Sequence, residues 1–67
     1  MKLIQFIGPL EARTYLKIYD FKGNNIWNGT AQALNYDVLN YSLRDKEVFK
    51  VCLNFNCLDI TIYEQNN

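Results

Sequence analysis

The sequence contains no histidine, and only two cysteines, one proline and one tryptophan occur among its 67 residues. The absence of histidine excludes the usual general base and every Ser-His or Cys-His nucleophile arrangement. Cys52 and Cys57 alone cannot supply all the ligands of a Cys/His zinc site within a single chain. Asp20 and Asp59 are the only acidic residues inside expected strands, and no pattern brings them together. We therefore predict a protein that is not an enzyme and has neither a metal site nor a cofactor.

Long apolar runs and net charge are also missing. The apolar start at residues 3–7 is interrupted by Gln5 and ended by a Gly-Pro pair, and it is too short for a signal peptide. No segment approaches the roughly 20 apolar residues that cross a bilayer. Seven basic and seven acidic side chains cancel, which argues against nucleic acid as the partner. We expect a cytoplasmic protein with reduced thiols and no membrane partner.

Apolar residues, in contrast, are abundant. They make up 49% of the chain and include five tyrosines and four phenylalanines, so the composition lies far from that of disordered proteins. A chain of this length buries only about 60% of its unfolded surface and can form one core of marginal stability. We predict a single small domain over residues 1–63, followed by a frayed polar tail over residues 64–67.

Strand periodicity predicts the first two strands. Residues 2–7 are expected to form an N-terminal strand, which the following Gly-Pro pair ends because proline cannot donate to a ladder. Residues 13–21 alternate apolar and polar side chains in the manner of a second strand. Leu16 and Ile18 share one face of this second strand.

A two-residue turn at residues 23–24 connects the second strand to a third, because glycine and asparagine accept the positive φ that such turns require. The third strand covers residues 25–31. This register places Gly29 opposite Ile18 and leaves a shallow space that Trp27, on the same face, fills. We also expect a bulge next to Gly29.

Alternation breaks down at residues 34–43, where one or two helical turns are expected. Asn35 is a suitable N-cap, and Leu34 and Leu39 have the spacing of a hydrophobic staple. Such a helix would bury Leu34, Val38 and Leu39 over one face of the sheet. The charged segment that follows it is expected to be a turn.

The last hairpin is predicted from matching apolar positions. Its loop is either residues 55–56 or the four residues 54–57. Each inner position meets an apolar partner: Leu53 with Leu58, Val51 with Ile60 and Phe49 with Ile62, with Phe55 on the same face. Cys52 and Cys57 then lie on the opposite face, as reduced thiols with a structural role. A disulfide between them, or metal or redox chemistry, are the alternatives.

Together these features predict an α+β fold that is mostly β. It has five short strands, arranged as two hairpins plus the N-terminal strand, and one short helix between strands three and four. An SH3-like partly open barrel or a curved sheet capped by the helix would accommodate this order of elements.

One face of the second strand is the candidate binding surface, because it interleaves aromatic rings with a lysine: Tyr15, Lys17, Tyr19 and Phe21. Trp27 joins this face only if the preceding turn is not the two-residue loop. Such a surface can bind a protein, since Trp and Tyr dominate interface hot spots. It can also stack on the bases of single-stranded nucleic acid. The third interpretation is that this face forms part of the core.

Residues 18–34, followed by residues 36–40, resemble a pattern in small uncharacterised proteins of phages and prophages of low-GC bacteria. The matching positions are Ile18, Tyr19, Asp20, Ile26, Trp27, Gly29, Ala31, Val38 and Leu39. The resemblance implies a mobile-element origin and an accessory binding role.

The predicted function is therefore a non-enzymatic protein-interaction module of phage origin, whose protein partner the sequence does not identify. An exposed sheet edge and a marginal core also favour self-association into a homodimer. The alternative is a weak single-stranded nucleic-acid-binding small β-barrel that uses Tyr15, Lys17 and Tyr19, together with Trp27 where that residue joins the same face.

Overall fold

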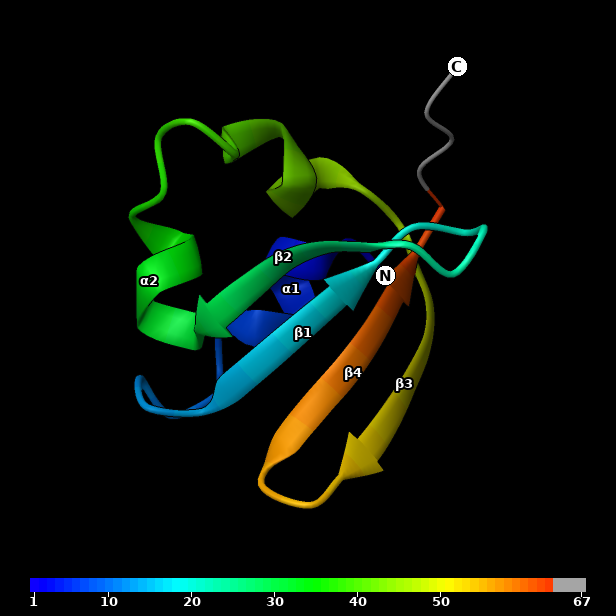
Figure 1. Cartoon of the computed structure of the whole chain (residues 1–67). Coiled ribbons are helices and arrows are strands. Elements are labelled where there is room, and N and C mark those ends of the chain that lie inside the picture. Colours follow the sequence, from blue (N-terminus) through cyan, green and yellow to red (C-terminus); the bar gives the residue numbers. More distant parts are fainter. Residues whose placement is uncertain (64–67) are drawn as a thin grey trace.

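The computed structural model describes residues 1–63, so the frayed tail expected at residues 64–67 lies outside the described residues. Four strands form one open sheet in the order β2-β1-β4-β3 (Figure 1). The strands are β1 (Tyr15–Tyr19), β2 (Asn25–Thr30), β3 (Val48–Asn54) and β4 (Cys57–Ile62). Three short helical segments accompany them: α1 (Leu3–Ile7), α2 (Ala31–Asn35) and the 3₁₀ helix η1 (Tyr41–Asp45). The small α+β class, mostly sheet, is confirmed.

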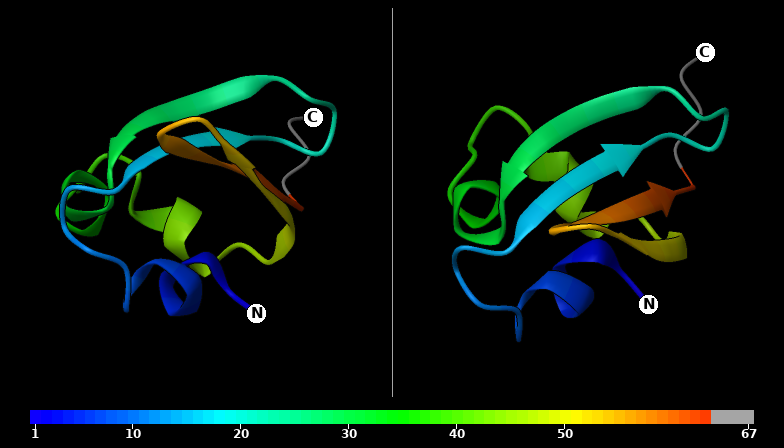
Figure 2. Two further views of the ribbon diagram at one scale, coloured as in Figure 1. Left: turned by 90° about the horizontal axis from the view of Figure 1, so that it is seen from below. Right: turned by 60° about the horizontal axis from the view of Figure 1, so that its bottom comes forward.

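The molecule has two layers (Figure 2). The sheet forms one layer, and α1 and η1 lie together against its inner face, whereas α2 follows the end of β2 at the side. The core between the layers consists of Leu3, Ile7, Leu16, Ile18, Ala31, Leu34, Leu43, Ile60 and Ile62. The other face of the sheet, called the outer face below, is covered by no helix among residues 1–63.

The predicted N-terminal strand over residues 2–7 is wrong, because this segment forms α1. A strand would have put Gln5 on the same face as Leu3 and Ile7. In the helix, Leu3 and Ile7 are one turn apart and fully buried, whereas Gln5 accepts a hydrogen bond of 2.8 Å from the backbone N–H of Lys2. The helix therefore resolves the conflict that the polar residue creates in a strand.

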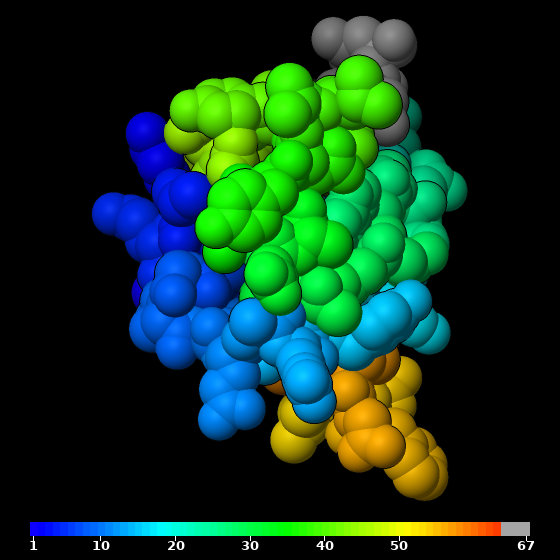
Figure 3. Space-filling view, turned by 90° about the vertical axis from the view of Figure 1, so that its left-hand side faces the viewer, coloured from blue at the N-terminus to red at the C-terminus, as the bar shows by residue number. Residues whose placement is uncertain are grey.

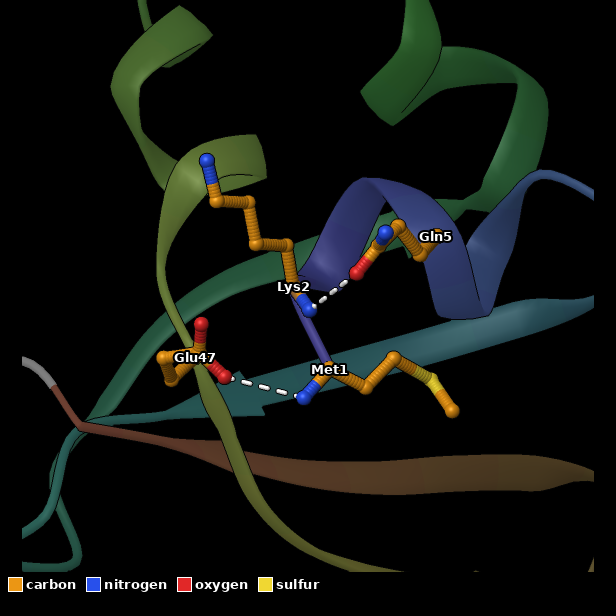
Figure 4. Close-up of polar contacts among 4 residues, drawn as sticks. All are labelled: Met1, Lys2, Gln5 and Glu47. Carbon is orange, nitrogen blue, oxygen red and sulfur yellow. Dashed lines mark hydrogen bonds and ion pairs between the residues drawn. The ribbon is translucent and has the colours of Figure 1, made fainter.

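The N-terminus runs beside the beginning of β3 (Figure 4). Lys2 forms an isolated antiparallel bridge with Glu47, and the backbone N–H of Val48 donates to the carbonyl of Met1 at 2.9 Å. The terminal ammonium of Met1 also lies 2.9 Å from Oε2 of Glu47. Within β3, these contacts occupy the outer backbone edge of its first residue, Val48, only.

The β1–β2 hairpin has a three-residue loop of Phe21, Lys22 and Gly23, since the N–H of Asp20 donates to the carbonyl of Asn24. Gly23 adopts φ 93°, the left-handed conformation that ends such loops. The predicted two-residue loop at residues 23–24 is therefore wrong, and the register differs by two positions.

Gly29 consequently lies opposite Leu16, and Trp27 lies opposite Ile18. A shift of two positions preserves the face of each side chain, so Trp27 still covers Gly29 as expected. A Cβ atom on Gly29 would lie 2.7 Å from Cη2 of Trp27. The irregularity in this ladder occurs between Ile18 and Tyr19 rather than beside Gly29.

Helical turns do occur between the third and fourth expected strands, but they form two separate segments, α2 and η1, instead of one helix within residues 34–43. Helix α2 begins earlier, because the side chain of Thr30 accepts a hydrogen bond from the N–H of Ala33, and Asn35 is its last residue rather than its N-cap. Leu34 is buried as expected. Val38 and Leu39, in contrast, are 83% and 95% exposed, because the chain between α2 and η1 is a loop. The expected charged turn is occupied by the end of η1.

The β3–β4 hairpin largely follows its predicted register. Leu53 pairs with Leu58 and Val51 with Ile60, around the two-residue loop 55–56. The pair of Phe49 with Ile62 is wrong, because a bulge between Val48 and Lys50 places Val48 opposite Ile62. The bulge removes Phe49 from the inner face.

The two hairpins join through β1 and β4, which pair in parallel with Ile18 beside Ile60. This pairing makes β1 and β4 central and leaves β2 and β3 as edges of an open sheet. An SH3-like barrel was not found. Among residues 1–63, no helix is long and apolar enough to cross a membrane.

Candidate functional site

The outer face of the sheet carries most of the predicted binding residues. Strand alternation directs Tyr15, Lys17 and Tyr19 of β1 away from the buried Leu16 and Ile18. Tyr15 is exposed, and Lys17 and Tyr19 are half-buried. The row therefore lies outside the fully buried core, and its half-buried residues agree with only part of the third interpretation.

Three aromatic rings meet at one end of this face and form what we call the aromatic cluster, Phe21, Phe49 and Tyr63. The ring centroids of Phe21 and Tyr63 are 5.3 Å apart and nearly parallel. Phe49 packs edge-on against both, at 4.9 Å from Phe21 and 5.0 Å from Tyr63. All three side chains remain exposed, at 45%, 45% and 52% respectively. Such geometry is favourable for ring pairs, and it fixes an apolar surface in place.

Three separate segments supply the aromatic cluster. Phe21 belongs to the β1–β2 loop, Phe49 to the bulge of β3, and Tyr63 directly follows β4. The parallel pairing of β1 with β4 brings the first and last of these segments to the same end of the sheet (Figure 1). The bulge then turns Phe49 toward them.

Asp20 fixes the loop that presents Phe21. Its buried carboxylate accepts hydrogen bonds of 2.9 Å from the backbone N–H groups of Lys22 and Asn24, and one of 3.1 Å from the side-chain amide of Asn24. The N–H of Asn24 is the main reason that the pKa of Asp20 lies below its ordinary value, with burial acting in the opposite direction. Asp20 is therefore structural, and it is an acceptor in a turn rather than an acid or base.

Charges of both signs lie on the middle of the outer face. Lys17 is the register partner of Asp59, and Asp59 lies opposite Cys52. The carboxylate of Asp59 accepts from the Cys57 thiol at 3.5 Å. Burial, followed by this contact with Asp59, raises the pKa of the Cys57 thiol, whereas Lys17 lowers it. The face therefore carries charges of both signs, and the raised pKa favours the protonated form of the Cys57 thiol.

The cysteines lie on the outer face, opposite the apolar seam of the hairpin, as predicted. Cys52 is exposed, Cys57 is half-buried, and both are free thiols. Residues 1–63 contain no group of three or more His, Cys, Asp or Glu side chains placed to hold a metal ion. Asp20 and Asp59, the two carboxylates considered from the sequence, lie in a turn and in the middle of a strand.

Trp27 does not belong to this face. It packs against the core on the inner side, covers Gly29, and donates from Nε1 to Oδ2 of Asp37 at 2.8 Å. Asn40 also donates to Asp37 from its side chain and its backbone, and these bonds, led by that of the Asn40 side chain, lower the pKa of Asp37. Trp27 thus ties β2 to the loop between α2 and η1.

The sequence interpretation missed Phe49 and Tyr63. Phe49 was assigned to the inner face because the strand was assumed to alternate without interruption. One available signal was the run Val48, Phe49, Lys50, Val51, in which two apolar residues precede the lysine and break strict alternation. Tyr63 gave no such signal, because its position depends on a parallel pairing between distant segments.

Two further surface features lie away from this face. The loop between α2 and η1, together with the first residue of η1, exposes four apolar side chains: Tyr36, Val38, Leu39 and Tyr41. This loop lies on the side of the molecule shown in Figure 3. A shallow depression of about 400 Å³ lies near the start of this loop, lined by Leu10, Ala12, Ala31, Gln32, Asn35 and Tyr36. The phenol of Tyr36 is the ionisable side chain in this lining, and no carboxylate, amine or thiol accompanies it.

Comparisons with known proteins returned no matching family model, no matching curated protein and no matching solved structure. The case for function therefore depends on the geometry of the outer face.

Proposed function

We propose that the protein is a non-enzymatic interaction module that binds a protein partner through the outer face of its sheet. The contact is centred on the aromatic cluster, with Tyr19 and Lys17 beside it. The observation that carries this proposal is the exposure of three mutually packed rings on a face that no described helix covers. Aromatic side chains of this kind dominate the binding energy of protein interfaces.

The packing of the cluster supports the same proposal on entropic grounds. Rings that already contact one another lose little freedom when a partner covers them, so more of the burial energy contributes to affinity. Lys17 and Asp59 would orient the partner without favouring a polyanion, because their charges are opposite. A partner with an apolar centre and both signs of charge at its rim fits this surface.

The test is affinity capture from a lysate of the source organism with three immobilised chains: wild type, the double variant Phe49→Ala/Tyr63→Ala, and Tyr36→Ala. Tyr36 is 77% exposed and lies outside the aromatic cluster, so its variant is a matched control for the loss of an exposed ring. A partner of the outer face is retained by wild type and by Tyr36→Ala. The double variant should lose about tenfold or more in affinity for that partner.

Equal recovery of every captured protein by the three chains contradicts the proposal. Urea unfolding of the three chains accompanies the capture, since a double variant that is unfolded at the capture temperature would lose the partner for another reason. In that case the single variant Tyr63→Ala, which retains two of the three rings, replaces it.

Binding of single-stranded nucleic acid is a second candidate, favoured by one observation: Tyr15 and Tyr19 flank Lys17 on an open sheet face. The neighbouring Asp59 weakens the attraction for phosphate. Trp27 is not a suitable reporter because it lies on the inner side, so anisotropy of a labelled oligonucleotide is the appropriate measurement. No rise in anisotropy at low salt, where such binding is strongest, rejects this candidate.

We also propose a mobile-element origin and an accessory role, on the basis of the resemblance of residues 18–40 to phage and prophage proteins. The genes that flank the coding sequence test this proposal. Integrase or phage structural genes nearby would support it, and a conserved block of metabolic genes would contradict it.

A further inference from the structure

The two edges of the sheet differ in how well they are protected. On β2, the amide side chains of Asn25 and Asn28 bond to each other, and Asn25 also donates to the backbone carbonyl of Trp27 at 3.4 Å. On β3, the N-terminus covers only Val48, and the remaining edge is open among residues 1–63. An open strand edge is a template for pairing with another strand.

The register of the hairpin identifies the backbone groups on this open edge. In a hairpin with a two-residue loop, the flanking residues, here Asn54 and Cys57, exchange both backbone hydrogen bonds. Because hydrogen-bonded and non-hydrogen-bonded pairs alternate, Cys52 also bonds toward β4. Val51 and Leu53 therefore direct their N–H and C=O groups to the open edge.

The side chains along the same edge are more apolar and more exposed than solubility favours. Leu53 is 79% exposed and Phe55 is 96% exposed, and the hairpin that carries them projects from the body of the protein (Figure 3). Phe55 also has φ 55°, and it is the only non-glycine residue with positive φ among residues 1–63. A bulky residue in this conformation is strained, and glycine is preferred there. An aromatic ring is thus presented at the hairpin tip at a loss of stability.

The geometry points to a homodimer in which the open edge of β3 pairs with the same edge of a second copy. An antiparallel pair with its two-fold axis at Cys52 sets Val51 against Leu53 of the other copy, and Leu53 against Val51. Every edge-directed N–H and C=O of these two residues then finds a partner. A closed two-fold pair also leaves no open β3 edge for a third copy.

The second copy is favoured over another partner because this register is self-complementary along the whole open edge. Apolar Val51 and Leu53 meet across the axis on the inner face, and Lys50 meets neutral Asn54 on the outer face. The exposed Phe55 reaches the beginning of the neighbouring β3, where Phe49 lies. The zero net charge of the chain adds no long-range repulsion between copies.

This register places the two Cys52 residues directly opposite each other in a non-hydrogen-bonded pair. The Cα atoms of such a pair are about 4.5 Å apart, which lies within the range of a disulfide. The thiols need not be joined for the dimer to form, but their proximity makes Cys52 a reporter of the register.

The first test is sedimentation equilibrium at several concentrations. The wild-type mass should move from 7.9 kDa toward twice that value as concentration rises. Leu53→Lys should weaken association about tenfold or more, because a charge at the pairing edge prevents strand addition. Leu39→Lys makes the same substitution at a residue that is 95% exposed but lies in a distant loop, and should leave association unchanged.

Two outcomes of this experiment overturn the proposal. One is a wild-type chain that stays at 7.9 kDa up to about 1 mM. The other is a dimer that Leu53→Lys and Leu39→Lys affect equally. Because both side chains are largely exposed, neither change should unfold the monomer, which circular dichroism checks.

The second test uses Cys52 in a Cys57→Ser background. Diamide accepts the two hydrogen atoms as two Cys52 thiols form one disulfide, and the covalent dimer is quantified on a non-reducing gel. Adding Leu53→Lys should slow cross-linking about tenfold or more, whereas adding Leu39→Lys should not, although Cys52 stays equally exposed in both. Equal rates would overturn the register.

The dimer does not depend on the proposed function. Leu53→Lys leaves the aromatic cluster intact, so it tests self-association alone. Tyr63→Ala tests the partner, because the dimer register brings Phe55 of the second copy to Phe49, which this variant keeps. If both proposals hold, the continuous sheet of the dimer places both aromatic clusters on the same side, and a bivalent partner would bind with increased avidity.

Discussion

The two hairpins of this sheet are held by different forces. Side-chain hydrogen bonds set the β1–β2 hairpin: Asp20 closes its loop, and Trp27 connects β2 to Asp37. The β3–β4 hairpin depends mainly on apolar pairs such as Val51 with Ile60, and beside its loop the Asn54 side chain donates to Asp59 at 3.3 Å. The register of a hairpin in a short chain can thus be fixed either by side-chain hydrogen bonds at its loop or by apolar side chains that pair between its strands.

The difference also separates the two proposed surfaces. The polar loop holds Phe21 in position for the aromatic cluster at one end of the sheet. The bare hairpin tip at the other end exposes Leu53 and Phe55 for a second copy. In the proposed dimer, Phe55 of the second copy approaches Phe49, so the two surfaces meet at this one ring of the aromatic cluster.

Ile60→Ala should lower the stability of the second hairpin more than any other change considered, because Ile60 is fully buried between Ile18 and Val51. Removal of its side chain should lower the free energy of unfolding by about 2–5 kcal/mol. Leu53→Ala, in the same hairpin but 79% exposed, should change it by less than about 0.5 kcal/mol in dilute protein. Urea unfolding measures both. A similar loss of unfolding free energy for the two variants would show that the apolar pairs between β3 and β4 do not stabilise the hairpin.

The same contrast explains which parts of the fold could be predicted. Apolar residues alternate in both β3 and β4, so a register shift of one position would turn the apolar side chains of one strand toward solvent. For this reason the pairs of Leu53 with Leu58 and of Val51 with Ile60 could be predicted correctly. In the first hairpin, glycine and three asparagines allow several turns. The hydrogen bonds that the carboxylate of Asp20 accepts from the loop backbone stabilise one of these turns. These bonds exist only in the folded loop, so the sequence did not reveal them.

The remaining errors arise from long-range contacts. Residues 3–7 fit a strand or a helix by pattern, and the packing of Leu3 and Ile7 under the sheet decides for the helix. The parallel pairing of β1 with β4 joins segments that are far apart in the chain, so no short sequence pattern predicts it. For this reason Phe21 was identified as a candidate site residue from the sequence, whereas Phe49 and Tyr63 were not.

Gly29→Ala tests the packing between the first hairpin and its loop. The new Cβ would lie 2.7 Å from the indole of Trp27, so the ring must move and its bond to Asp37 is strained. We expect a loss of about 1–3 kcal/mol, with a red shift of Trp27 emission. Gly23→Ala is the contrast, because there the space is open and only the positive φ opposes a side chain. It should lose about 1 kcal/mol and leave the emission unchanged.

Acid should weaken the first hairpin before the second. The pKa values of Asp20 and Asp37 are lowered in the folded protein by the hydrogen bonds they accept. Their contribution to stability is therefore complete above the unfolded value of about 4, and is lost as pH falls through the lower folded values. Asp20→Asn should be less stable at neutral pH and should lose part of this dependence. Thermal unfolding between pH 2 and pH 7 measures it, and an unchanged slope in Asp20→Asn would contradict the role of Asp20.

Phe55→Gly should have a small effect on stability, and its sign is the reverse of those above. Glycine relieves the positive φ of Phe55 at the tip of the second hairpin, which should raise the free energy of unfolding by about 0.5–1 kcal/mol in dilute protein. The same change removes an exposed ring from the proposed dimer edge, so self-association should weaken while the monomer becomes more stable. Asn56→Gly, at the neighbouring loop position, is the control that changes the turn and keeps the ring. Urea unfolding and sedimentation of the two variants separate the conformational strain of Phe55 from its role in association. A Phe55→Gly chain that is less stable than wild type and equally dimeric would refute both interpretations.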